Sequence, residues 1–281
     1  MRAKSTWIAV LLAPWLVAVG FPVAAMVKWD NATGTCASPS GPDGSMASCA
    51  PTTPSGGTSL TETALSNTGA GGTLVAAAYV GTYGGGLGIT SQGEALSDPQ
   101  HAMDNNGNSE FMLLSFGASV KLGAVEIGYF SGDSDVSVLA YTGCSSGQTC
   151  SPNPIGDAYT SLVGTTTGTG WTLVGHYANL ASNTPRSVNA YSGGLPTAQS
   201  VTSSYWLIGA YNNSFGTTTS DPGSSATSGM ASGNDYMKLL AMYGDKTTVV
   251  VPPSSIPEPS SLLLMGIALL AMIELRRRRT I

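Results

Sequence analysis

Oxygen-bearing side chains recur in two short segments of this 281-residue chain. Asp104, Asn106 and Asn108 occupy alternate positions, and Asp133 and Asp135 repeat that spacing further along. Calcium prefers such hard oxygen ligands and often takes them from loops. These residues are therefore candidate calcium ligands. We nevertheless expect no cofactor, because Asp and Asn at such positions are more often turn formers that make local backbone hydrogen bonds.

The four cysteines form two pairs of near neighbours, Cys36 with Cys49 and Cys144 with Cys150. Four cysteines allow three connectivities, of which we expect this local one. Zinc is disfavoured because no C-x-x-C motif occurs and neither histidine stands near the cysteines in a ligand pattern. Disulfides are the default in an oxidising compartment.

A catalytic motif is matched formally by residues 143–147, which read Gly-Cys-Ser-Ser-Gly and fit G-x-S-x-G. A nucleophile of this type needs a strand, a sharp turn and a helix. The motif instead lies between two cysteines and is followed by Ser-Pro-Asn-Pro, which cannot begin a regular helix. We expect a disulfide-closed loop and no enzyme, with a secreted hydrolase as an alternative.

Aromatic side chains could bind carbohydrate if they were exposed on one face of a sheet. Trp171, Trp206, Tyr205 and Tyr211 are candidates. Buried core positions are the more frequent explanation for such residues.

The elements that must position these residues read as short strands. Period-two or continuous apolar patterns predict strands at 74–80, 110–116, 122–129, 135–141, 171–177, 204–210 and 236–243. Long Gly/Ser/Thr loops separate them, and no sustained helical period occurs in the body. The expected fold is a single all-β antiparallel sandwich of jelly-roll type over 72–246, with an immunoglobulin-like sandwich as the alternative. Residues 26–71, rich in Ser, Thr, Pro and Gly, are expected to form a loop-like N-terminal arm.

The body is acidic. Of the 11 Lys and Arg residues, two lie in the first 25 residues and four near the C-terminus, whereas only two of the 16 Asp and Glu residues lie in those segments. This balance disfavours nucleic acid as a partner, because phosphates require basic patches.

Both ends of the chain look like targeting segments. Arg2 and Lys4 precede an apolar stretch, and small residues up to Ala25 suit cleavage by a signal peptidase, so 1–25 reads as a secretory signal peptide. An uncleaved N-terminal anchor is the alternative.

The C-terminal segment has three parts in a fixed order. After a linker over 247–256 come Pro257, Glu258, Pro259 and Ser260, then an apolar run over 262–273, then Arg276, Arg277, Arg278 and Arg279. The run is short for a bilayer crossing, but flanking arginines favour the cytoplasmic side. This order at 257–281 resembles the PEP-CTERM sorting signal, and an ordinary C-terminal anchor is the alternative.

The resemblance implies that an exosortase of a Gram-negative bacterium recognises the tail. The short transmembrane helix and the arginines would hold the tail transiently in the inner membrane, while the body goes to the cell surface or extracellular matrix. The body also resembles exosortase-dependent surface proteins in the block 101–141 and in the strand beginning at Asp235. We therefore expect a non-catalytic exported protein. A glycan- or calcium-binding module that adheres to exopolysaccharide is the rival hypothesis.

Overall fold

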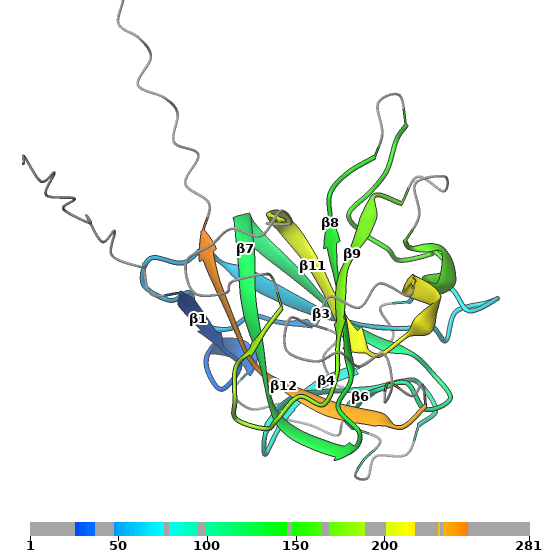
Figure 1. Ribbon diagram of the computed structural model, residues 1–281, viewed down its shortest axis with the longest axis horizontal. Helices are drawn as coiled ribbons and strands as arrows, with labels where there is room; N and C mark the ends of the chain where they lie inside the picture. The colour runs from blue at the N-terminus through cyan, green and yellow to red at the C-terminus, as the bar shows by residue number, and fades with distance from the viewer. Residues whose placement is uncertain are drawn as a thin grey trace, which may run out of the picture.

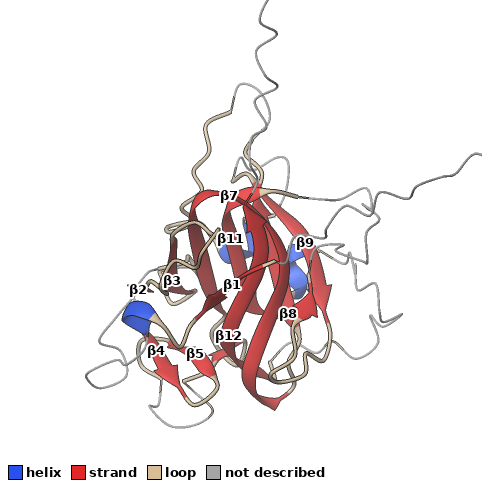
Figure 2. Cartoon of the chain, turned by 90° about the vertical axis from the view of Figure 1, so that its left-hand side faces the viewer, coloured by secondary structure: helices blue, strands red, loops and turns tan. Residues whose placement is uncertain are grey.

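The computed structural model describes residues 26–36, 48–75, 79–94, 99, 101–144, 148–163, 169–188, 201–216, 230 and 233–246. Within these ranges the chain forms strands and three short 3-10 helices (Figures 1 and 2). In chain order they are β1 (Val27–Asp30), η1 (Gly34–Cys36), β2 (Ser48–Cys49), β3 (Leu60–Ser66), β4 (Tyr79–Tyr83), β5 (Gly86–Thr90), β6 (Met103–Asp104), β7 (Glu110–Gly132), β8 (Val136–Tyr141), η2 (Tyr159–Ser161), β9 (Trp171–Tyr177), β10 (Arg186–Ser187), β11 (Ser203–Ala210), η3 (Asn213–Phe215) and β12 (Asp235–Lys246). No helix in the described ranges has the length and apolar character that a membrane crossing needs.

Strand β7 organises the sheet. Its first part, 110–116, pairs with β3 on one side and with β11 on the other, and β11 continues to β8 and β9. Its second part, 120–132, pairs with β12, which also pairs with β1, β5 and β6. Figure 1 shows β7 (green) running between β11 (yellow) and β12 (orange). The first part of β7 thus lies in a first layer with β3, β11, β8 and β9. Its second part lies in a second layer with β1, β6, β12, β5 and β4, which pairs with β5. One long strand therefore belongs to both layers of an antiparallel sandwich, and the predicted all-β sandwich is confirmed.

The main core lies between the two layers. Met112 and Leu114 of β7 and Trp206 of β11 meet Val125 of β7 and Leu239 of β12 in one buried cluster. The ring of Trp29 in β1 packs edge-on against Phe116, with centroids 5.0 Å apart. Side chains of alternate residues point to the same face of a strand, so this core takes every second residue over 112–116. A register shift near residue 123 changes the phase, and the core then takes Val125 and Ile127.

A second apolar cluster covers the opposite face of the first layer. Phe111 and Leu113 of β7 point away from the main core and pack with Leu207 of β11, Trp171 of β9 and Phe215 of η3. A strand buried on both faces reads as a continuous apolar run and not as an alternating one. That double burial explains the run at 111–114.

The structure differs from the expected loop-like arm over 26–71. Strands β1 and β3 are parts of the sheet, and Trp29 and Leu60 are buried. The pattern of β3 hid this, because its buried face carries the acid Glu62 beside Leu60 and Ala64. The predicted strands at 110–116 and 122–129 are also one continuous strand.

Glycine misled the sequence interpretation at β5. Residues 84–86 are three consecutive glycines, a residue type depleted in strands, yet Gly86 begins a strand whose residues are all buried. A Cβ on Gly88 would lie 1.8 Å from the carbonyl oxygen of His101, and one on Gly86 would lie 2.4 Å from that of Leu239. The glycines are needed because neighbouring backbones approach closely there.

Both predicted disulfides are confirmed. Cys36 bonds to Cys49 and Cys144 bonds to Cys150, so none of the four cysteines is free. The expected signal peptide (1–25), linker (247–256) and C-terminal tail (257–281) lie outside the described residues, as does the part of the G-x-S-x-G motif at 145–147.

Candidate functional site

Three aspartates meet where β7 ends and β12 begins. Asp133 and Asp135 follow β7, and Asp235 is the first residue of β12; carboxylate oxygens of the three lie within 4.8 Å of one another. Oδ1 of Asp235 accepts a hydrogen bond from the backbone N–H of Asp135 at 2.8 Å. Oδ1 of Asp135 accepts one from the backbone N–H of Asn179, also at 2.8 Å. These bonds fix the carboxylates to the start of β8 and to the loop after β9.

A second carboxylate group lies beside β6. Glu94, Asp104 and Glu110 also place oxygens within 4.8 Å of one another. Oε2 of Glu110 accepts from the backbone N–H of Asp104 at 3.2 Å, and Oε1 of Glu94 accepts from Nδ2 of Asn108 at 3.1 Å. Asp104 pairs with Tyr236 of β12, the residue next to Asp235.

Asn105 connects the two groups. Its Nδ2 donates to Oδ2 of Asp235 at 2.6 Å and to the carbonyl of Tyr211 at 2.8 Å. Its Oδ1 accepts from the backbone N–H groups of Gly233 and Asp235 at 2.9 and 3.1 Å. The structure thus brings the two predicted calcium segments, 104–108 and 133–135, to the same end of the sandwich.

The predicted ligands do not all point at one place. Asn106 donates from its side chain to the hydroxyl of Tyr236, and Asn108 donates to Glu94. Asp235, Glu94 and Glu110 were not among the predicted ligands: Asp235 lies 100 residues from Asp135, and Glu94 and Glu110 lie outside the alternate-residue spacing of 104–108. The best-formed oxygen cluster is therefore Asp133, Asp135 and Asp235.

Burial raises the pKa of several of these acids. Desolvation raises the pKa of Asp104 to about 7, with the charge of Glu94 adding to the rise. Desolvation likewise raises the pKa of Asp235 to about 7, with Asp135 and Asp133 adding to it. The pKa of Glu110 is raised well above its usual range by desolvation and by the charges of Asp104 and Glu94. Either protons or a cation can reduce the repulsion among these groups.

The hydrogen bonds of Glu110 agree with a bound proton. The hydroxyl oxygen of Ser91 lies 2.6 Å from Oε1 of Glu110 and 2.6 Å from the hydroxyl oxygen of Ser66. Ser91 has one hydrogen and can donate to only one of them. A protonated Glu110 donates to Ser91, which then donates to Ser66.

A buried serine and histidine also make contact. Oγ of Ser137 lies 2.9 Å from Nδ1 of His176, and Nε2 of His176 lies 2.9 Å from the carbonyl oxygen of Gly216. Since a carbonyl only accepts, Nε2 carries the hydrogen and Nδ1 accepts from Ser137. Desolvation lowers the pKa of His176, opposed by its bond to Gly216. Both side chains are buried, and the pair ties β8 and β9 to the end of η3.

The candidate sugar-binding aromatics divide between core and surface. Trp206 and Trp171 are buried in the two core clusters, which favours the structural alternative for them. Tyr205 and Tyr211 are half-buried. A different aromatic group lies on the second layer, where Tyr83 stacks on His101 with centroids 4.2 Å apart.

Comparison with known families gives a match at the C-terminus. Residues 255–279 match the family model of the PEP-CTERM protein-sorting motif. The chain carries a PEP-CTERM sorting signal. Comparison with curated proteins and with solved structures gave no match.

The PEP-CTERM match marks the chain as an exosortase substrate that is exported across the membrane and sorted to the surface. It includes all four predicted sorting residues, 257–260, and the arginines at 276–279. The match does not extend to the body, so the resemblance of the body to exosortase-dependent surface proteins stays a prediction.

Proposed function

We propose that this protein is a non-catalytic component of the cell surface or extracellular matrix, held transiently in the membrane by its tail and cut by an exosortase near Pro257. The observation that carries the proposal is the PEP-CTERM match at 255–279. A disulfide-bonded sandwich in front of this tail supports it, because disulfides persist in oxidising compartments outside the cytosol.

The test replaces Pro257, Glu258 and Pro259 together with alanine. The apolar run and the arginines stay intact, so we expect uncut protein to accumulate in the membrane fraction. Mass spectrometry of the surface protein checks the mature C-terminus of the wild type, which is expected near Pro257. The control replaces Pro252 and Pro253, which lie just before the matched segment, and is expected to be processed normally. Surface protein that still carries Arg279 would contradict the proposal.

Calcium-dependent attachment is a second candidate function of the body. It is supported by the meeting of Asp133, Asp135 and Asp235 at one end of the sandwich, where three carboxylates repel one another without a cation. Calcium accepts carboxylate oxygens in flexible coordination geometries, so these three side chains suit it.

Thermal melting at pH 8 with calcium, magnesium or a chelator tests this second candidate. Calcium is expected to raise the melting temperature of the wild type, and Asp133→Asn together with Asp135→Asn is expected to remove that rise. Magnesium in the same buffer is the control for the general effect of ionic strength on the melting temperature. Equal melting in all three buffers would exclude a calcium site.

A further inference from the structure

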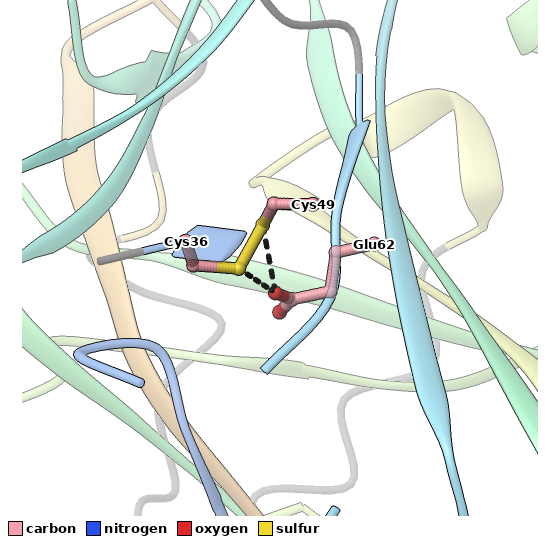
Figure 3. A group of neighbouring side chains, drawn as sticks. All are labelled: Cys36, Cys49 and Glu62. Carbon is pink, nitrogen blue, oxygen red and sulfur yellow. Dashed lines mark hydrogen bonds between the residues drawn. A yellow bond between two sulfur atoms is a disulfide. The ribbon is translucent and has the colours of Figure 1, made fainter. Parts of the chain in front are cut away.

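A buried carboxyl group lies against the Cys36–Cys49 disulfide (Figure 3). Cys36 ends η1, Cys49 lies in the edge strand β2, and Glu62 is the partner of Cys49 across the β2–β3 pair. Oε2 of Glu62 lies 3.3 Å from Sγ of Cys49 and 3.5 Å from Sγ of Cys36. Glu62 is 0% exposed, and the cysteines are 2% and 5% exposed. The carboxyl group therefore touches both sulfur atoms inside the protein.

The hydrogen in this contact belongs to Glu62, because a disulfide has none to donate. Among the described residues, Oε1 of Glu62 and Oδ1 of the adjacent Asn31 have no hydrogen-bond partner. The Asn31 amide group donates to the carbonyl of Leu239 at 3.0 Å. An ionised Glu62 would be a buried charge among unpaired acceptors, which is costly.

Desolvation makes Glu62 a weaker acid than an exposed glutamate. It raises the pKa of this carboxyl to about 8, and the nearby Asn31 amide opposes the rise. No charged side chain contributes among the described residues. At neutral pH Glu62 is thus a neutral acid that holds its proton next to the sulfur atoms.

A water-sized cavity borders the disulfide. It has a volume of about 10 Å³ and is lined by both cysteines and by Thr35 and Thr82, among others. This volume is about what one water molecule needs, and the threonines supply polar partners. A water molecule in this cavity would touch the two sulfur atoms that must gain protons when the disulfide is reduced.

We propose that Cys36, Cys49 and Glu62 form a thiol–disulfide exchange site, in which Glu62 protonates the cysteine that leaves when a dithiol reductant attacks. The reductant's thiolate attacks one Sγ, forming a mixed disulfide and breaking the Cys36–Cys49 bond. The expelled sulfur takes the proton of Glu62, whose carboxylate is reprotonated from water. The second thiolate of the reductant then closes its own disulfide and expels the other cysteine, which takes a proton from water.

The position of the Cys36–Cys49 disulfide means that its reduction would change how the two layers are connected. Cys36 follows β1, which pairs with β12 in the second layer, and Cys49 lies beside β3 in the first layer. The disulfide therefore joins the two layers at one edge of the sandwich. Its reduction removes that link, and the two free thiols can then exchange with a disulfide of another protein.

The test measures reduction of both disulfides in the full chain, kept in detergent, with dithiothreitol between pH 6 and 9.5. Alkylation and peptide mass spectrometry give the rate at Cys36–Cys49 and at Cys144–Cys150, which lies in a more exposed loop. The ratio of the two rates cancels the ionisation of the reductant. Circular dichroism at each pH checks that the protein stays folded.

For the wild type we expect a ratio that is constant below about pH 8 and falls above it, as Glu62 loses its proton. Glu62→Gln keeps the shape and neutrality but has no acidic proton, so its ratio should be at least about tenfold lower at pH 7 and flat with pH. Glu62→Asp should restore the fall at high pH. If Glu62 acted only on stability, its ionisation would loosen the fold and the wild-type ratio would rise above pH 8. The proposal would be overturned by that rise or by identical profiles for wild type and Glu62→Gln. It would also be overturned if Cys36 and Cys49 were not alkylated in the folded protein.

Discussion

Buried carboxyl groups determine how this protein responds to pH. Burial raises the pKa of Glu110, so the folded state holds its proton more tightly than the unfolded state. A group of this kind stabilises the fold fully below its unfolded pKa, near 4.5, and its contribution is lost as pH rises through the folded value. We expect the free energy of unfolding to decrease as pH rises above about 4.5.

The substitution Glu110→Gln isolates this effect. Glutamine keeps an oxygen to accept from the N–H of Asp104 and an amide to donate to Ser91, as the protonated acid does. The variant should melt close to wild type at pH 4 and at a higher temperature than wild type at pH 8. Thermal melts in chelator-containing buffers at pH 4, 6 and 8 measure this difference. A difference that is the same at all three pH values would show that Glu110 is not protonated in the fold.

The sequence predicted the residues of the acidic site only in part. Asp133 and Asp135 were identified by their spacing, whereas Asp235 lies 100 residues further on and has no spacing to reveal it. Glu62 gave no signal, because an acid in an alternating strand reads as an exposed residue. Pairing across strands, which sequence does not specify, placed both residues at their sites.

Among the elements, strands with strong apolar patterns were predictable. Residues 171–177 were predicted as a strand and form β9 with the same bounds, and 204–210 differs from β11 by one residue. Strand β5 was missed because its glycines contradict strand propensity. The sequence does not show that the backbones of neighbouring segments approach β5 closely, which is the reason that glycine is needed there.

That close approach can be tested with Gly88→Ala. The added methyl group would meet the carbonyl of His101 at 1.8 Å, so β5 or the 101 segment must shift. We expect a loss of about 2 kcal/mol or more in the free energy of unfolding, which corresponds to roughly 5 °C in melting temperature for a domain of this size.

Gly84→Ala is the matched control for this element. A Cβ there has open space, so its melting temperature should stay close to wild type. Equal melting of the two variants would mean that β5 does not lie against residue 101 as described.

At the scale of the whole molecule, one strand and one disulfide join what would otherwise be two separate layers. β7 continues from the first layer into the second, and Cys36–Cys49 links the layers at the β1–β2 edge. A chain that must remain folded outside the cell gains from such links, because a disulfide restricts the unfolded state. The exchange site proposed at Glu62 would place one of these two links under redox control.

The arginines of the tail should determine membrane retention before cleavage. Positive charges after an apolar run favour the cytoplasmic side, and each contributes about 1 kcal/mol near an anionic leaflet. Replacing Arg276, Arg277, Arg278 and Arg279 with serine should therefore decrease the uncut protein found in the membrane fraction. Replacement of the same four with lysine keeps the charge and should retain the protein as the wild type does. Quantitative immunoblotting of membrane, surface and medium fractions measures this. If the serine variant were retained and cut as the wild type is, burial of the apolar run alone would hold the tail, and the arginines would have no role in retention.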